Sequence, residues 1–183
     1  SFSFECINQT KTIMRLTIKK LFAVLILSGI GITASFAQAY EKGNNLLNVG
    51  AGIGGGFGTP IGLSFEHGFS DKISGGAYVA YASKTTPTGF GDYKYTYILT
   101  AARASYHFDL EVEKLDTYIG AILGYNIASA KWTGAGAAPV ASAGGIIYGG
   151  HVGARYYVSE KIGIFAEAGY GLGSLNAGLA FKF

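Results

Sequence analysis

Four charged side chains interrupt the polar faces of segments that otherwise alternate between apolar and small residues: Glu66, Arg103, Arg155 and Glu167. Each lies about four to six residues from a tight turn, which at about 3.3 Å per residue places them at similar heights in a closed sheet. An unpaired charge in such an interior is costly, so two acids and two bases are expected to pair. The sequence therefore predicts an interior salt-bridge network. The functional alternative is a gate whose pairs exchange to open a small pore.

The three histidines do not suggest a catalytic or metal site. His67, His107 and His151 lie near a turn, at a rim and within a strand, and no two have metal-binding spacing on one face. The chain has no Gly-x-Ser-x-Gly elbow. Catalytic, metal and cofactor sites are therefore not expected. An enzyme that modifies lipids remains an alternative, with Ser83, Asp92 and Ser129 in connections that no histidine is expected to approach.

The elements that would position these residues are strands. Apolar residues recur with a period of two, and no segment after residue 40 has a helical period. The expected strands span about 46–54, 61–69, 73–83, 95–108, 117–128, 145–158, 162–170 and 175–183. A tilted membrane-spanning strand needs about this length. The pattern predicts an all-β fold, an eight-stranded antiparallel up-and-down transmembrane β-barrel.

The connections between these strands differ in length in a regular way. Ser70-Asp71-Lys72 and Ser159-Glu160-Lys161 are tight turns, whereas 84–94 and 129–144 are the long connections. Membrane barrels have short periplasmic turns and longer external loops. The order of the connections therefore indicates which end of the barrel would face outward.

Aromatic residues gather near both ends of the apolar faces, with small aliphatic residues between them. This distribution predicts two interfacial belts. The belt residues are Tyr81, Tyr125, Tyr148 and Tyr170 at the external end, and Tyr106, Phe108, Tyr156, Phe181 and Phe183 at the other.

Bulk composition supports one apolar domain without a charge-driven partner. Of 183 residues, 49% are hydrophobic and 14% are charged, and the net charge is +3. Residues 1–37 carry four basic residues and one acidic residue, which accounts for all of that charge. A nucleic-acid partner is therefore not expected. The one cysteine, Cys6, lies in the same segment, which excludes disulfides from the rest.

The amino-terminal segment has the features of a secretory signal peptide. Met14 precedes basic residues, an apolar stretch from Leu21 to Ile32, and small residues suited to cleavage after Ala37 or Ala39. The apolar stretch is too short for a membrane helix. We expect an upstream extension over 1–13, a signal peptide over 14–39 and a barrel domain over 40–183.

The final segment, Leu175–Phe183, alternates strictly and ends on an aromatic residue, so we expect it to close the barrel against the first strand. With the leader and the hairpins, it resembles the small outer-membrane β-barrel proteins of Gram-negative bacteria, the porin-family barrel domain typified by the OmpA membrane domain and OmpX. The resemblance implies location in the bacterial outer membrane, contact with its lipid and delivery by its assembly machinery. It also implies that Phe183, Phe181 and Leu179 form the assembly signal.

The function indicated by these features is structural or concerned with passage of small solutes, through a lumen filled by side chains. One alternative is adhesion or partner binding through loops 84–94 and 129–144, where Tyr93, Tyr95, Tyr97 and Trp132 cluster. Tyrosine and tryptophan also favour membrane interfaces, which is the preferred role for this cluster. The lipid-modifying enzyme is the second alternative.

Overall fold

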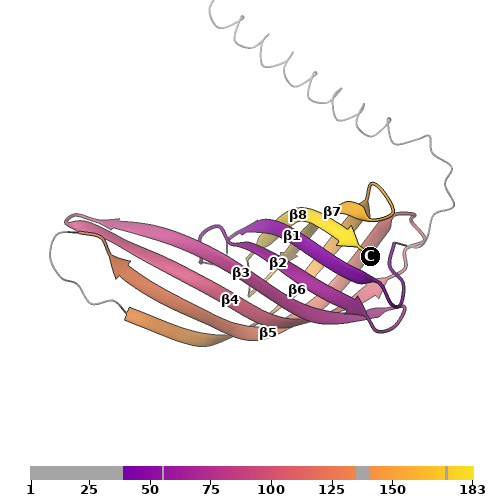
Figure 1. Ribbon diagram of the computed structural model, residues 1–183, viewed down its shortest axis with the longest axis horizontal. Helices are drawn as coiled ribbons and strands as arrows, with labels where there is room; N and C mark the ends of the chain where they lie inside the picture. Colours follow the sequence, from indigo (N-terminus) through magenta and orange to yellow (C-terminus); the bar gives the residue numbers. More distant parts are fainter. Residues whose placement is uncertain (1–38, 55, 135–140, 172) are drawn as a thin grey trace, which may run out of the picture. The chain divides into compact units, whose positions relative to one another are not determined.

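The computed structural model describes residues 39–183 except 55, 135–140 and 172. Within these residues eight antiparallel strands close into a barrel in sequence order, as predicted (Figure 1). The strands are β1 (Asn45–Ile53), β2 (Ile61–Gly68), β3 (Ile73–Thr88), β4 (Gly91–Phe108), β5 (Leu115–Trp132), β6 (Ala141–Tyr157), β7 (Ile162–Gly169) and β8 (Leu175–Lys182). The expected extension over 1–13, residues 14–38 of the expected leader and the cleavage site after Ala37 lie outside the described residues, whereas Ala39 lies within them.

The barrel closes between its first and last strands, as the sequence predicted. The register of β1 and β8 runs from Leu46 opposite Lys182 to Ile53 opposite Leu175. The Asn45 amide donates to the Phe183 carbonyl over 2.8 Å, and the Phe183 amide donates back over 3.0 Å. Closure removes both open edges of the ring, which a sheet in lipid cannot leave unpaired.

Side chains alternate between the outer wall and the lumen because the strand period is two. Large apolar side chains on alternate positions are exposed on the outside, including Val49, Leu63 and Leu123. The intervening positions are buried or small. Phe165 uses the space left by two lumen-facing glycines, since a Cβ at Gly50 or Gly178 would lie 2.9 Å from its ring.

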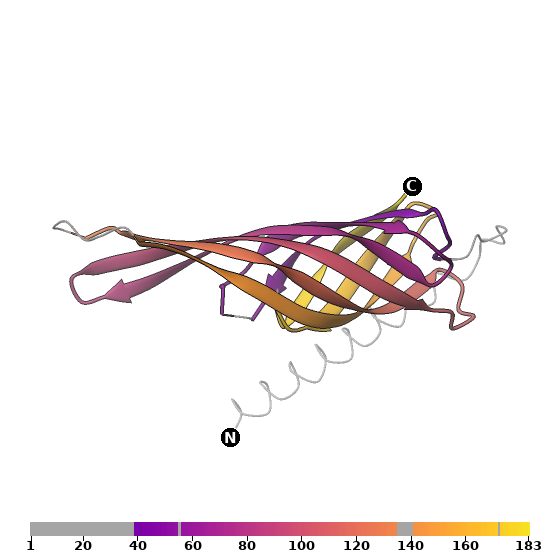
Figure 2. The ribbon, with the colours of Figure 1, turned by 90° about the horizontal axis from the view of Figure 1, so that it is seen from below.

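The four central strands are about twice as long as the other four, and they extend beyond the ring as a four-stranded sheet (Figures 1 and 2). We call this sheet the β3–β6 extension, and the end of the barrel that carries it the loop end. The opposite end, with connections 69–72, 109–114 and 158–161, is the turn end. The prediction of a loop over 84–94 is wrong, because β3 and β4 continue through this range and remain paired as far as Thr88 and Gly91. The expected loop over 129–144 is shorter at both ends, because Ala130 pairs with Ala141.

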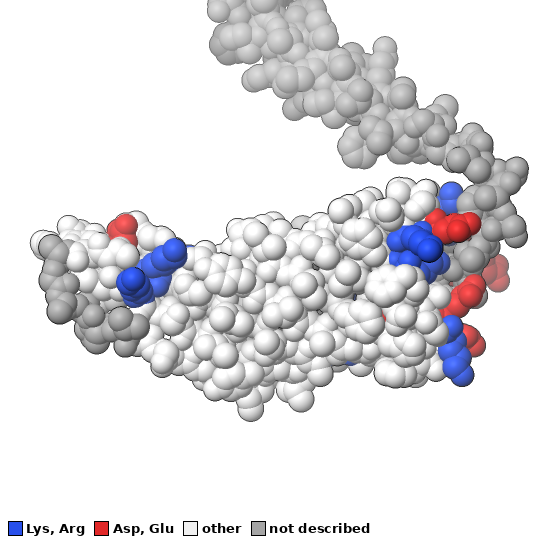
Figure 3. Space-filling model, in the orientation of Figure 1, with Lys and Arg blue, Asp and Glu red and all other residues white. Residues whose placement is uncertain are grey.

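On the face drawn in Figure 3, charged side chains gather at the two ends of the barrel. Lys84, Asp92, Lys94 and Lys131 belong to the strands of the extension, and the other exposed charges of the described residues lie at the turn end. The wall between them is apolar. Among the described residues, no helix is both long enough and apolar enough to span a membrane.

Candidate functional site: the charged layer of the lumen

The four charged residues singled out from the sequence meet inside the barrel near the turn end. Arg155 Nη2 donates to Glu66 Oε1 over 2.6 Å, and Arg103 Nη2 lies 2.5 Å from Glu167 Oε1. Arg103 Nε is 2.9 Å from Glu66 Oε1, without the direction of a hydrogen bond. All four side chains are buried. Glu66 therefore contacts both guanidinium groups, and Glu167 contacts only that of Arg103.

Asp116 is a fifth charged member of this layer, and the sequence analysis missed it. Arg155 Nη1 donates to Asp116 Oδ2 over 2.7 Å. The strand expected over 117–128 begins two residues earlier than predicted, because β5 starts at Leu115 and turns Asp116 into the lumen. Three carboxylates thus share two guanidinium groups. The signal that could have identified Asp116 is its spacing of two from Tyr118, which is fully buried.

Hydroxyl and aromatic groups add further hydrogen bonds and ring contacts to the charged layer. Ser74 and Ser105 both donate to Glu66 Oε2, over 2.9 and 2.6 Å. Tyr118 donates to Glu167 Oε1 over 2.7 Å, and its ring lies 4.1 Å from the Arg155 guanidinium carbon. Buried charges persist in a protein when partners of this kind satisfy them. The layer is consequently a connected polar network that crosses the lumen.

His107 lies in the lumen rather than at an exposed rim. Its Nδ1 is 2.6 Å from Asp116 Oδ1 and its Nε2 is 2.8 Å from Ser74 Oγ. These are the contacts of a serine, histidine and acid triad. Ser74, however, is fully buried and also bonds Glu66, so a substrate has no access to its hydroxyl. The geometry gives these residues a role in positioning, not in nucleophilic attack.

Tyr40 covers the charged layer from the turn end. Its ring stacks on His107 with centroids 3.6 Å apart, and its hydroxyl donates to the Ser70 carbonyl over 2.8 Å. Burial, followed by the nearby carboxylates of Asp116, Glu66 and Asp71, raises the pKa of Tyr40 to about 12. The segment before β1 therefore closes this mouth of the lumen with a neutral, hydrogen-bonded phenol.

The other two histidines are separate from this contact. His67 Nδ1 is 2.9 Å from Asn45 Oδ1, and His151 Nε2 is 3.4 Å from Ser105 Oγ. Within the described residues, no group of three or more histidine, cysteine, aspartate or glutamate side chains is arranged to hold a metal ion.

An apolar layer fills the lumen on the loop side of the charges. Ala80, Leu99, Ala101 and Ile122 form its buried core, and Phe57 from the β1–β2 connection packs against them. A cavity of about 10 Å³ lies between the two layers, beside Tyr78 and Glu167. A single water needs about that volume.

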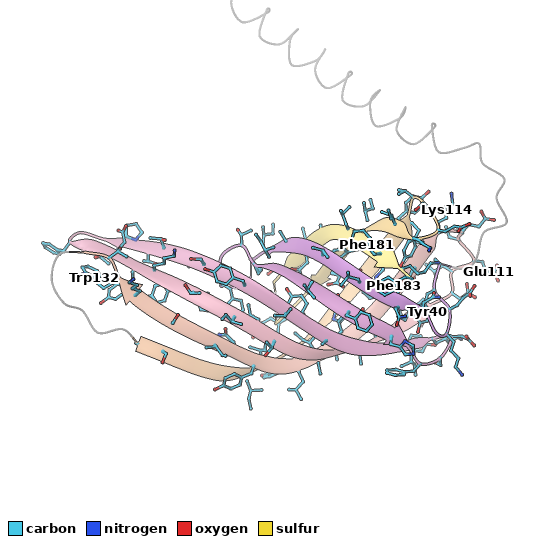
Figure 4. All side chains as sticks on the ribbon, viewed as in Figure 1. Tyr40, Glu111, Lys114, Trp132, Phe181 and Phe183 are labelled. Atoms are coloured by element: carbon cyan, nitrogen blue, oxygen red, sulfur yellow. The ribbon has the colours of Figure 1, made fainter. Side chains whose placement is uncertain are left out.

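The residues of the two expected aromatic belts lie on the outer wall of the barrel. Phe181 is half-buried, and the others are exposed. Figure 4 shows Phe181 and Phe183 at the end that also carries Tyr40. Phe65 and Phe183 have ring centroids 6.5 Å apart, which joins β2 to the closing strand. Leu179 is exposed on the same wall.

The external aromatic cluster has a different orientation from the belts. Tyr93, Tyr95 and Tyr97 share the face of β4 that carries Leu99 lower in the lumen, because they are separated by even numbers of residues. Trp132, at the loop end in Figure 4, has its ring centroid 4.9 Å from that of Tyr93. These side chains therefore lie on the lumen-side face, which is not the position on the outer wall that the preferred role at the membrane interface requires.

Comparison with solved structures shows the fold. The N-terminal β-barrel domain of Pseudomonas aeruginosa OprF is 18% identical, with 78% of this chain and 98% of that chain covered and a TM-score of 0.53. Ail of Yersinia pestis, the attachment invasion locus protein, is 15% identical over 78% of this chain and 99% of its own, with a TM-score of 0.52. Neisserial surface protein A is 18% identical, with 76% of this chain and 96% of that chain covered and a TM-score of 0.53.

These likenesses confirm the predicted fold: the chain is a small eight-stranded antiparallel barrel of the kind found in outer-membrane proteins. No family model matches the sequence, and no curated protein matches it either.

Proposed function

We propose that this protein is an integral barrel of the bacterial outer membrane with a structural role and a closed lumen. The turn end then faces the periplasm and the loop end faces outward. The apolar outer wall, bounded by charges at both ends, supports this placement. The shared fold with outer-membrane barrels supports it as well.

The observation that carries the closed lumen is the burial of Arg155. This side chain has no exposed area and contacts Asn48, Glu66 and Asp116, which come from β1, β2 and β5. A guanidinium bound to three strands spans the ring. An eight-stranded barrel is just wide enough to be filled in this way.

Conductance in planar bilayers tests the closed lumen. The folded protein and the Arg103→Ala variant are both expected to give no discrete openings, because the apolar layer still blocks the path after the ion pairs of Arg103 with Glu66 and Glu167 are removed. Regular openings in the unsubstituted protein would support the small-solute alternative instead. Openings confined to the variant would assign the charged layer the role of a gate.

A second candidate function is partner binding by the β3–β6 extension. Phe90 at the tip of the β3–β4 hairpin is 92% exposed, and the rings of Tyr93 and Trp132 contact each other at a tilt on the lumen-side face. Aromatic side chains that lie beyond the apolar wall do not serve lipid contact. Ail, with the same fold, has been crystallised with the heparin analogue sucrose octasulfate.

Adhesion of bacteria that display the barrel would test the second candidate. The Phe90→Ser and Tyr93→Ser variants are expected to lose attachment to host cells or to sulfated glycan surfaces. The Phe57→Ser variant is not a suitable control, because Phe57 packs in the lumen. Thr85→Ser on the outer face is the matched control, and equal attachment by all variants would exclude this candidate.

A further inference from the structure

The outer face of the β3–β6 extension changes character in steps along β4 and β5. The register places Ile98 opposite Ile127, then Thr96 opposite Ser129, and then Lys94 opposite Lys131. Each step advances two residues, or about 6.8 Å, along the strands. The wall thus passes from apolar side chains to hydroxyls to ammonium groups.

The hydroxyl step continues across all four strands of the extension. Ser83 on β3 pairs with Thr96, and Ser142 on β6 pairs with Ser129. Thr96 and Ser129 lie on the outer face because each is two positions from an exposed isoleucine, Ile98 or Ile127. Ser83 and Ser142 share that face because each lies directly opposite one of these two residues in the ladder. A continuous row of hydroxyl donors therefore lies between the apolar wall and the lysines.

The two lysines are an unfavourable pair within the sheet itself. Residues directly opposite each other have Cβ atoms about 4.5–5.5 Å apart, and like charges in such a pair are destabilising. Both lysines are exposed, and no described carboxylate lies within 4.0 Å of either ammonium group. Asp92 lies on the same outer face two residues from Lys94, whereas Lys84 lies on the lumen-side face. The outer face of the extension thus has two bases and one acid, and an anion would neutralise its remaining positive charge.

We propose that Lys94 and Lys131 bind the phosphate of an anionic lipid in the leaflet that surrounds the loop end, with the hydroxyl row as further donors. The position of the lysines favours a lipid over a soluble anion. They lie two steps beyond the apolar side chains of Ile98 and Ile127, at the level expected for lipid headgroups. Lysine is a frequent phosphate ligand as a point charge. The inference rests on the proposed membrane placement.

Reconstitution of the folded barrel tests the site. The probe is phosphatidic acid as a minor component of phosphatidylcholine vesicles, and the readout is lipid retained by the barrel in native mass spectrometry. Lys94→Gln and Lys131→Gln are each expected to weaken retention about tenfold, the effect of losing one charge-assisted contact. Lys84→Gln removes the same charge from the lumen-side face and is expected to leave retention unchanged.

The stability of the folded barrel is a second readout, because the effect of Lys131→Gln is expected to have opposite signs with and without phosphatidic acid. In phosphatidylcholine alone, Lys131→Gln relieves the like-charge pair and raises the urea midpoint of unfolding. With phosphatidic acid present, the same substitution lowers the midpoint. Equal loss of retained lipid in all three lysine variants would overturn the site and indicate a general charge effect.

Three further outcomes distinguish failure of the proposed lipid site from failure of the proposed membrane placement. Competition by inorganic phosphate at the same concentration as the lipid would overturn the lipid as the occupant. Insertion into both vesicle types with no retained phosphatidic acid would overturn the site while leaving the membrane placement intact. Failure to insert into either vesicle would contradict the placement itself.

Discussion

Arg155 Nη1 lies 2.7 Å from Asp116 Oδ2, and this contact ties β6 to the first lumen-facing residue of β5. The same guanidinium reaches Glu66 on β2 through Nη2. The pair with Asp116 joins neighbouring strands, because Asp116 and Arg155 lie opposite each other in the ladder. The pair with Glu66 crosses the lumen and connects strands that are not neighbours in the sheet. The ladder hydrogen bonds hold adjacent strands together, and the charged layer fixes the ring against collapse or opening across its diameter.

Removal of Arg155 is expected to be strongly destabilising. The Arg155→Met variant leaves Glu66 and Asp116 buried without their shared cation, and breaking a buried pair in this way costs about 3–5 kcal/mol. Urea unfolding of the barrel in lipid vesicles measures the loss.

The control for this variant is Lys161→Met, which removes a cation from an exposed turn and is expected to change stability little. Addition of Glu66→Gln to Arg155→Met is expected to restore part of the loss. A fully stable single variant would contradict the account of the network.

The sequence predicted the strands and the layer wherever one face meets lipid, because the period-2 contrast is strong there. Glu66 and Arg103 were identifiable as isolated charges in apolar segments. Asp116 was hidden because it follows an acidic connection, so its charge looked like a continuation of the loop. The extension was missed for a related reason. Polar or charged residues occur on both faces of the extension near Thr85 and Lys94, so hydrophobic periodicity disappears although the ladder continues.

The glycine at position 178 is expected to be necessary for closure of the barrel. A Cβ there would overlap the Val49 carbonyl oxygen on the neighbouring strand β1 and would lie 2.9 Å from the Phe165 ring. The Gly178→Val variant therefore separates β8 from β1 or displaces Phe165. We expect slower folding into vesicles and a lower urea midpoint.

Gly89→Ala is the matched control for Gly178→Val, because a Cβ at Gly89 meets nothing within 4 Å. Folding can be followed by the mobility difference between folded and unfolded barrels on gels without heating. Unchanged folding of Gly178→Val would mean that β1 and β8 tolerate a wider spacing than the structure has.

Alkaline pH is expected to release the segment that covers the turn end. The pKa of Tyr40 is raised to about 12, against an ordinary value of about 10, so folding favours the neutral phenol. The contribution of Tyr40 is complete below about pH 10 and is lost as the pH rises through about 12. Protease access to the segment before β1 measures the release.

Tyr40→Phe keeps the ring stacked on His107 but removes the ionisable hydroxyl and its bond to Ser70. This variant is expected to be more accessible at neutral pH and to show a weaker pH dependence between 10 and 12. An identical alkaline profile in both proteins would assign the release to another group.

A charge on the outer wall is expected to interfere with insertion according to its depth. Leu123 is 62% exposed in the middle of β5, so Leu123→Arg places a guanidinium in the hydrocarbon and is expected to cost about 2–4 kcal/mol. Ser129→Arg, six residues further along the same face of β5, enters the headgroup region and is expected to cost about 0–1 kcal/mol. Urea unfolding in vesicles of one lipid composition compares the two. Because both variants add the same charge to the same strand, only depth distinguishes them, and equal losses would contradict a membrane boundary between these positions.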